Sequence, residues 1–178
     1  VHLLLAAGAN VNVRDKDGDT PLNVAVKGDR ADIITNLLDA GADVNDRDRD
    51  GETALTIAAE KGSLKSLSIL LQAGANPNLA THEGETPLLI ATTNGYTELV
   101  KILIEAGANL NAREKQGDTS LHIAAVEGYT EIVATLLQAG ADVDRINGLG
   151  DTALILAVLQ NRQAIAELLL KYGANPNS

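Results

Sequence analysis

Apolar residues recur at helical spacing in short stretches of this chain, and glycines separate the stretches. In the segment YTELVKILIEAG, residues 96–107, one face of a helix would carry Leu99, Val100, Leu103 and Ile104. A glycine follows the last apolar turn and can end the helix. The pattern therefore predicts a short amphipathic helix here.

A shorter apolar stretch precedes this kind of helix and begins at a threonine. Thr20 is a good N-cap, and Pro21 suits the first helical position, where no backbone hydrogen bond is lost. Leu22, Val24 and Ala25 are expected to bury one face of this helix. The chain is thus predicted to form pairs of short helices.

These pairs are copies of one unit. Five hexapeptides, TPLNVA, TALTIA, TPLLIA, TSLHIA and TALILA, begin at positions 20, 53, 86, 119 and 152, each 33 residues after the last. A second series, of the type AGANVN, keeps the same period. A third series is the glycine that stands two places before each threonine: Gly18, Gly51, Gly84, Gly117 and Gly150.

The three series resemble the ankyrin repeat family, whose units have this length and a T-P-L-H-x-A signature. The resemblance covers the whole chain and implies one mainly α-helical domain, 1–178, an ankyrin-repeat α-solenoid of stacked helix-turn-helix units with β-hairpin tips. A partial repeat at 1–13 would be followed by complete repeats at 14–46, 47–79, 80–112, 113–145 and 146–178.

The turn between the two helices of a repeat has glycine in the three middle repeats. Gly62, Gly95 and Gly128 fit a left-handed helix end. Asp29 and Asn161 take this place in the first and last complete repeats. Both residue types tolerate left-handed geometry, so we expect these two turns to form as well.

The family signature is incomplete in this chain. Its histidine is present only as His122, where a hydrogen bond at the helix start is the expected role. Asp144 replaces the asparagine that closes the AGADVN-type segment in the other repeats. The other residues at the histidine position are Asn23, Thr56, Leu89 and Ile155.

The segment DRDRDG, residues 46–51, looks like the start of a calcium-binding EF-hand loop. Such a loop needs a bidentate glutamate at its twelfth position, which here is Ile57. The equivalent segments LATHEG, AREKQG and RINGLG lose the acids and keep the glycine. We therefore interpret the glycine as the architectural element of a hairpin tip and the acids as incidental.

Composition narrows the possible functions. The formal net charge of −10 argues against binding nucleic acid or anionic membrane, because phosphates repel acids. The absence of Cys excludes disulfides and thiol chemistry, without fixing the compartment; we expect a cytoplasmic protein.

His82 with Glu83 and Glu85 could suggest a metal or acid–base site, but we interpret the three residues as part of a solvated hairpin tip. Without catalytic or metal-ligand spacing, we expect no enzyme activity, cofactor or metal.

Resemblance implies that the chain binds another protein through hairpin tips and first helices on a concave face. The tips contribute Lys16, Asp17, Arg49, Asp50, His82, Glu83, Lys115, Gln116 and Leu149. The ends of the first helices contribute Lys27, Glu60, Lys61, Thr93, Asn94, Val126, Glu127, Leu159 and Gln160, with Ile146 beside them. An acid before each threonine completes the set: Asp19, Glu52, Glu85, Asp118 and Asp151.

Several interpretations stay open. The five acids suit helix N-termini, and they also form a stripe for a partner with a basic surface. The apolar residues Val126, Ile146, Leu149 and Leu159 are candidate hot spots for binding a partner. Alternatively, they pack against each other or under a further repeat. The chain would be a monomeric binding module, a targeting or regulatory segment of a larger enzyme or channel, or a scaffold without a ligand. Both ends look internal, unless Asn161, Arg162, Gln163 and Lys171 form a modest cap.

The interpretation of DRDRDG predicts that calcium at low millimolar concentration leaves the melting temperature nearly unchanged. The reason is that a loop without the twelfth ligand cannot enclose the ion. Thermal melts followed by circular dichroism check this. A rise of many degrees would contradict the interpretation.

Overall fold

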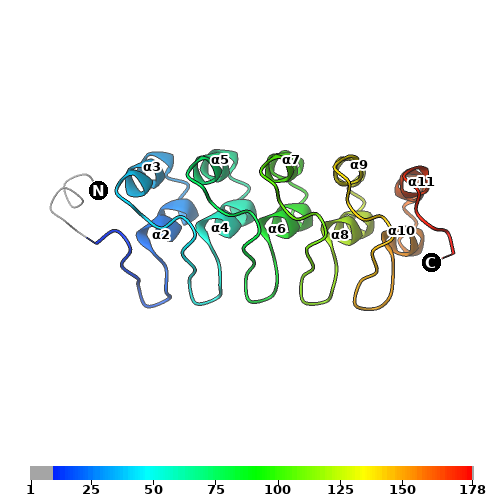
Figure 1. Cartoon of the computed structure of the whole chain (residues 1–178), viewed down its shortest axis with the longest axis horizontal. Helices are drawn as coiled ribbons and strands as arrows, with labels where there is room; N and C mark the ends of the chain where they lie inside the picture. Colours follow the sequence, from blue (N-terminus) through cyan, green and yellow to red (C-terminus); the bar gives the residue numbers. More distant parts are fainter. Residues whose placement is uncertain (1–9, 178) are drawn as a thin grey trace.

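The computed structural model describes residues 10–177 as a single row of helix pairs (Figure 1). The first helices lie side by side in one layer, the second helices form another layer, and long loops project from the row on one side (Figure 1). The helices are α2 Pro21–Lys27, α3 Ala31–Asp39, α4 Ala54–Lys61, α5 Leu64–Gln72, α6 Pro87–Thr93, α7 Thr97–Glu105, α8 Ser120–Glu127, α9 Thr130–Gln138, α10 Ala153–Leu159 and α11 Gln163–Lys171.

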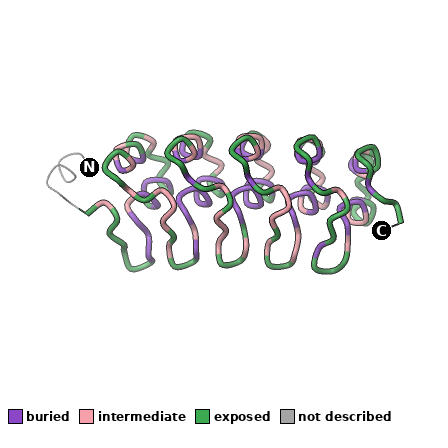
Figure 2. Tube along the Cα trace, viewed as in Figure 1, coloured by how far each residue is buried: buried purple, intermediate pink, exposed green. Residues whose placement is uncertain are grey.

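The core is a set of columns that run along the row and recur at the repeat period (Figure 2). The column between the second helices is made of leucines that are at most 4% exposed: Leu37, Leu70, Leu103, Leu136 and Leu169. The column of small residues in the first helices is at most 5% exposed: Ala25, Ala58, Ala91, Ala124 and Ala157. Small side chains there let neighbouring helices approach, and each buried leucine contributes about 1.5–3 kcal/mol.

The predicted buried face of α2 is wrong at one position. Leu22 and Ala25 are buried as expected, but Val24 is 53% exposed and Val26 is fully buried instead. The residue equivalent to Val24 in the next repeat is Ile57, which is fully buried, and its helix α4 packs against α2. Val24 lies at the N-terminal end of the described row, and the described residues include no helix before it.

Threonine starts each first helix, as the sequence predicts. Thr20, the residue before α2, accepts a hydrogen bond from the backbone N–H of Asn23 at 3.2 Å. Thr53 and Thr56 form a reciprocal pair in which each side chain accepts from the other's backbone N–H. Such caps satisfy backbone donors that a helix leaves free at its start.

The turns between paired helices adopt the predicted left-handed backbone. Asp29 and Asn161 have φ values of 48° and 54°, although neither is glycine. Gly62 has a further reason to lack a side chain. A Cβ atom there would lie 2.9 Å from Cζ of Tyr96 in the next repeat, and Gly95 stands in the same relation to Tyr129. The two tyrosine rings thus pack on turn glycines of the repeats before them.

A ladder of asparagines connects each repeat to the next. Asn45 accepts a hydrogen bond from the backbone N–H of Asn76 at 2.8 Å and donates through Nδ2 to the carbonyl oxygen of Gly74 at 3.4 Å. Asn12 and Asn78 make the same pair of bonds one period away. Asp144 keeps the accepting oxygen, which binds the N–H of Asn175, but a carboxylate has no amide to donate.

His122 joins two repeats in a different way. Its Nδ1 accepts the backbone N–H of Thr119 at 3.2 Å, and its Nε2 lies 3.1 Å from the carbonyl oxygen of Asp151 in the next repeat. Burial lowers the pKa of this imidazole, so its neutral form is favoured. Asn23 takes the same place in α2 and is fully buried, but its side-chain Nδ2 has no hydrogen-bond partner.

Replacing Asn23 with histidine is expected to stabilise the protein by about 0.5–1.5 kcal/mol. Glu52 lies 29 residues after Asn23, as Asp151 does after His122, so the new Nε2–H would reach the carbonyl of Glu52. Urea denaturation of Asn23→His against the native chain measures the gain.

The gain should shrink as the pH falls below 6.5, the ordinary pKa of histidine. Burial depresses the pKa in the folded state, so below this value the unfolded chain takes up a proton that the folded chain does not. Asn23→Leu is the control, since it removes the unsatisfied amide without adding a donor. Equal stability of the two variants would show that the inter-repeat bond is not formed.

Candidate functional site

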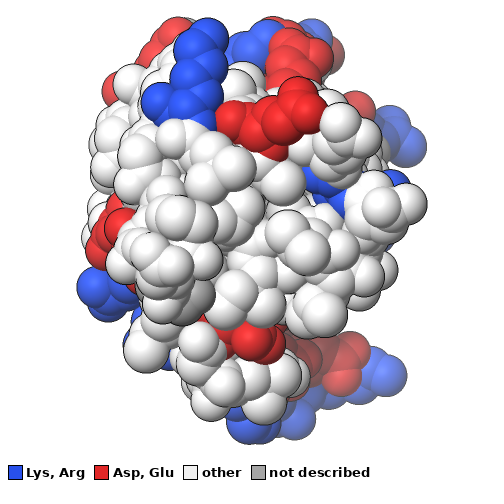
Figure 3. Space-filling view, turned by 90° about the vertical axis from the view of Figure 1, so that its right-hand side faces the viewer, with Lys and Arg blue, Asp and Glu red and all other residues white. Residues whose placement is uncertain are grey.

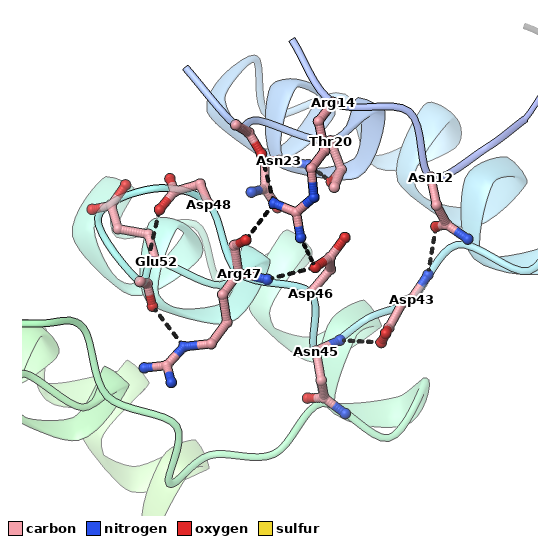
Figure 4. A network of polar contacts seen from close by, with 12 residues as sticks. Asn12, Arg14, Thr20, Asn23, Asp43, Asn45, Asp46, Arg47, Asp48 and Glu52 are labelled. Atoms are coloured by element: carbon pink, nitrogen blue, oxygen red, sulfur yellow. Dashed lines mark hydrogen bonds and ion pairs between the residues drawn. The ribbon is translucent and has the colours of Figure 1, made fainter. Parts of the chain in front are cut away.

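The projecting loops are tight turns, and in each of them a polar side chain holds the tip from inside. Figure 4 shows the loop of Asp46, Arg47 and Asp48. Oδ1 of Asp48 accepts the backbone N–H groups of Asp50 at 3.0 Å and Glu52 at 2.8 Å. Asp46 accepts from the N–H of Arg47 and pairs with Arg14 of the preceding repeat. Interpreting the acids of DRDRDG as incidental is therefore wrong, because these two fix the loop.

The other loops use the same device with different residue types. Asp15, Glu114 and Asn147 each accept two N–H groups from the tip that follows them. Thr81 supplies a hydroxyl oxygen to the N–H of Glu85. The position requires an acceptor rather than a charge, which is why the acids vary between repeats.

Sequence reasoning missed a set of arginines that brace the loops. Nε of Arg47 donates to the carbonyl oxygen of Gly51 at 3.1 Å, and Nε of Arg113 donates to Gly117 at 2.9 Å. Arg14 reaches the equivalent glycine through Nη1 at 3.0 Å. These arginines stand at the same position of the repeat, at 14, 47 and 113, and this recurrence could have identified them from the sequence. Ile146 occupies this place in the last repeat.

Neighbouring tips are bonded to each other. The backbone N–H of Lys115 donates to the carbonyl of Glu83 at 2.9 Å, and their side chains form an ion pair at 2.8 Å. The N–H of His82 donates to the carbonyl of Asp50, and the N–H of Gly148 donates to that of Gln116. These bonds align the tips in one row.

The acids before the threonines do not form a uniform stripe. Asp19 is only 9% exposed, and its carboxylate pairs with Nζ of Lys27 at 2.6 Å. Burial lowers the pKa of Lys27, but the hydrogen bond and charge of Asp19 raise it more, so its net shift is upward. Asp118 accepts a hydrogen bond from the side chain of Asn147. Asp19 therefore offers little of its charge to a partner.

Three carboxylates meet in a groove between the repeats 47–79 and 80–112. Glu52, Glu60 and Glu85 line a hollow of about 280 Å³, together with Ile90, Thr93 and Asn94. Burial raises the pKa of Glu52, and the charges of Asp48 and Glu60 raise it further. The groove therefore holds excess negative charge, and a cation placed there would favour the ionised form.

The C-terminal part of the same face is apolar. Leu149 is 86% exposed at its tip, Leu159 is 68% exposed at the end of α10, and Ile146 is 51% exposed. Val126 is half-buried. The structure thus places five of the predicted residues, Glu52, Glu60, Glu85, Thr93 and Asn94, along the groove. Four others, Val126, Ile146, Leu149 and Leu159, form an apolar region on the side of the tips and first helices.

The comparisons with known proteins decide the family. A family model described as ankyrin repeats in three copies matches residues 1–81 and 70–147, and a model of the single ankyrin repeat matches residues 149–178. The chain belongs to the ankyrin repeat family. A comparison with curated proteins finds no match.

Ankyrin repeats are generally protein–protein interaction modules and typically have no catalytic activity. Among residues 10–177 of this ankyrin array, no three His, Asp or Glu side chains are placed to hold a metal ion. No helix in that range is both long and apolar enough to cross a membrane. The remaining predicted binding residues are exposed or, for Asp151, half-buried: Lys16, Asp17, Arg49, Asp50, Lys61, His82, Glu83, Lys115, Gln116, Glu127, Asp151 and Gln160.

Truncating Asp48 to alanine is expected to destabilise the ankyrin array by about 1–2 kcal/mol, because two backbone donors lose their acceptor. Asp48→Asn should keep nearly full stability, since Asn147 performs the role natively. Asp50→Ala, at the exposed tip of the same loop, is the matched control and should change stability by less than about 0.5 kcal/mol. Urea titrations measure all three, and equal effects at 48 and 50 would refute the role of Asp48.

Proposed function

We propose that this ankyrin array is a non-catalytic module, expected in the cytoplasm, that binds one protein partner on the face of its tips and first helices. The observation that carries the proposal is the groove of Glu52, Glu60 and Glu85, which gathers residues from two repeats. The charges of Asp48 and Glu60 oppose ionisation of Glu52, and a cationic side chain that enters the groove relieves this repulsion, so the groove favours Lys or Arg of a partner with a basic surface.

The apolar region supports the same proposal from the other end of the face. Leu149 projects from a tip whose equivalents in earlier repeats are Asp17, Asp50, Glu83 and Gln116. Asn147 holds the loop of Leu149 from inside, and an exposed aliphatic side chain at such a tip gains free energy only when a partner covers it. The partner would thus present a basic segment toward the middle repeats and a bulky apolar residue toward Leu149, along the concave face expected from the family.

Capture from extracts of the source cells tests the proposal. The native chain should retain a basic protein, and retention should weaken as salt screens the groove. A triple variant with Glu52→Gln, Glu60→Gln and Glu85→Gln should lose most of the captured protein, as should Leu149→Asp.

A matched control changes the net charge equally on the second helices. Asp32→Asn, Asp39→Asn and Glu105→Gln alter exposed carboxylates of α3 and α7, away from the groove. Capture should survive in this control. If both triple variants lose the partner to the same extent, the effect is one of overall charge and the proposed groove is wrong.

A further inference from the structure

Two asparagines of the chain are followed by glycine: Asn94 by Gly95, and Asn147 by Gly148. Because glycine carries no Cβ, its backbone nitrogen approaches the side chain of the preceding residue with little steric hindrance. That nitrogen can attack Cγ of the asparagine and close a cyclic succinimide. The structure treats the two pairs very differently.

The reaction is balanced by water alone. The bond from the glycine nitrogen to Cγ forms, the bond from Cγ to Nδ2 breaks, and Nδ2 leaves as ammonia with the proton of the glycine N–H. Water then opens the ring at one or the other of its carbonyl carbons. The product is aspartate, or isoaspartate with the backbone running through the former side chain, and either one replaces a neutral amide with a carboxylate.

The structure holds Asn147 out of this reaction. Its side chain is 6% exposed, its Oδ1 accepts N–H groups of its own loop, and its Nδ2 donates to Asp118 of the preceding repeat at 2.9 Å. The attacking nitrogen, that of Gly148, donates to the carbonyl oxygen of Gln116 at 3.1 Å. Attack at Asn147 therefore requires the tip and its contact with the neighbouring repeat to open together.

Asn94 is held by bonds within its own turn. It is exposed directly after α6, where its Nδ2 donates to the carbonyl oxygen of Ile90 at 2.9 Å, and the N–H of Gly95 donates to that of Thr92 at 2.9 Å. Both acceptors belong to the last turn of a seven-residue helix, and helix ends open readily. Tyr129 packs on Gly95, but within the described residues its side chain forms no hydrogen bond to this turn. Opening one turn thus frees both reacting groups.

We propose that Asn94 is a modification site, at which spontaneous deamidation adds a carboxylate while Asn147 stays intact. Asn94 lines the groove of Glu52, Glu60 and Glu85, so the modification places a further negative charge there. Asn147 belongs instead to the C-terminal repeat, at the end of the row where the middle of the surface carries no charged side chains (Figure 3). The modification goes beyond the proposed function.

The neighbouring repeat shows that an acid fits at this position. Glu127 stands one period after Asn94, at the end of α8. Aspartate at 94 loses the amide that donates to Ile90 and lies at the negative end of α6, so it destabilises the turn without excluding the fold.

Peptide mapping by mass spectrometry tests the proposal on the purified chain, incubated in mildly alkaline buffer. In concentrated urea both sites should react at similar rates, and this experiment gives the intrinsic rate of each. In the folded chain Asn94 should react at least about tenfold faster than Asn147, because its reactive form needs a smaller opening. Isoaspartate among the products at 94 distinguishes the cyclic route from direct hydrolysis.

Asn94→Gln is the control, since a longer side chain closes the corresponding ring far more slowly. The acidic species that ion exchange separates from the incubated native chain should be absent from this variant. Equal rates at the two sites of the folded chain overturn the proposal, and so does reaction of Asn147 before Asn94. An acidic species that persists in Asn94→Gln also overturns it.

The effect of the added charge on the groove rests on the proposed function and is measured separately. Asn94→Asp, which reproduces one product, should bind an immobilised oligoarginine peptide tighter than the native chain by about twofold or more at low salt. Gln72→Glu adds the same charge at the exposed end of α5, in the other layer, and should leave this affinity unchanged. A chain that does not bind oligoarginine contradicts the proposed function, whereas the peptide map alone decides the modification.

Discussion

The structure depends on the fact that no repeat can bury its own apolar face. Each pair of helices exposes leucine and alanine on both sides, and only stacking against neighbours removes these side chains from water. The buried leucines and alanines recur every 33 residues because each repeat must place them where the next repeat can pack against them. Small residues in the first helices and leucines in the second set how closely adjacent repeats approach.

Polar groups then fix the register that the apolar columns leave open. The asparagine ladder binds backbone groups 29 and 31 residues along the chain, so it holds each repeat at one offset from the next. The tips add backbone bonds of their own, from His82 to Asp50 and from Lys115 to Glu83. Both the asparagine ladder and these backbone bonds between the tips therefore hold neighbouring repeats in register.

The periodic features of the fold could be predicted from the sequence, and the features that differ between repeats could not. Threonine caps, turn glycines and the left-handed Asp29 follow from local backbone chemistry, which a sequence displays directly. The roles of Asp48 and Arg47 depend on how a loop folds back on itself, and Asp19 looked like a free acid because Lys27 reaches it only across the helix. Val24 was misassigned because the apolar pattern does not show which side of the helix a neighbouring repeat covers, and in the described residues Val26 is buried instead. The acidic groove combines Glu52, Glu60 and Glu85 from two repeats, and only the stacking brings them together.

The joints at Asn111 and Asp144 each carry one hydrogen bond of the ladder, whereas the earlier joints carry two. An asparagine amide can donate a second bond, but the carboxylate of Asp144 can only accept. In an array whose stability is a sum over adjacent pairs, the repeats joined through Asn111 and Asp144 are connected by fewer polar bonds than the earlier ones. A partner that binds only the stacked form of these repeats would therefore shift their local opening equilibrium by mass action.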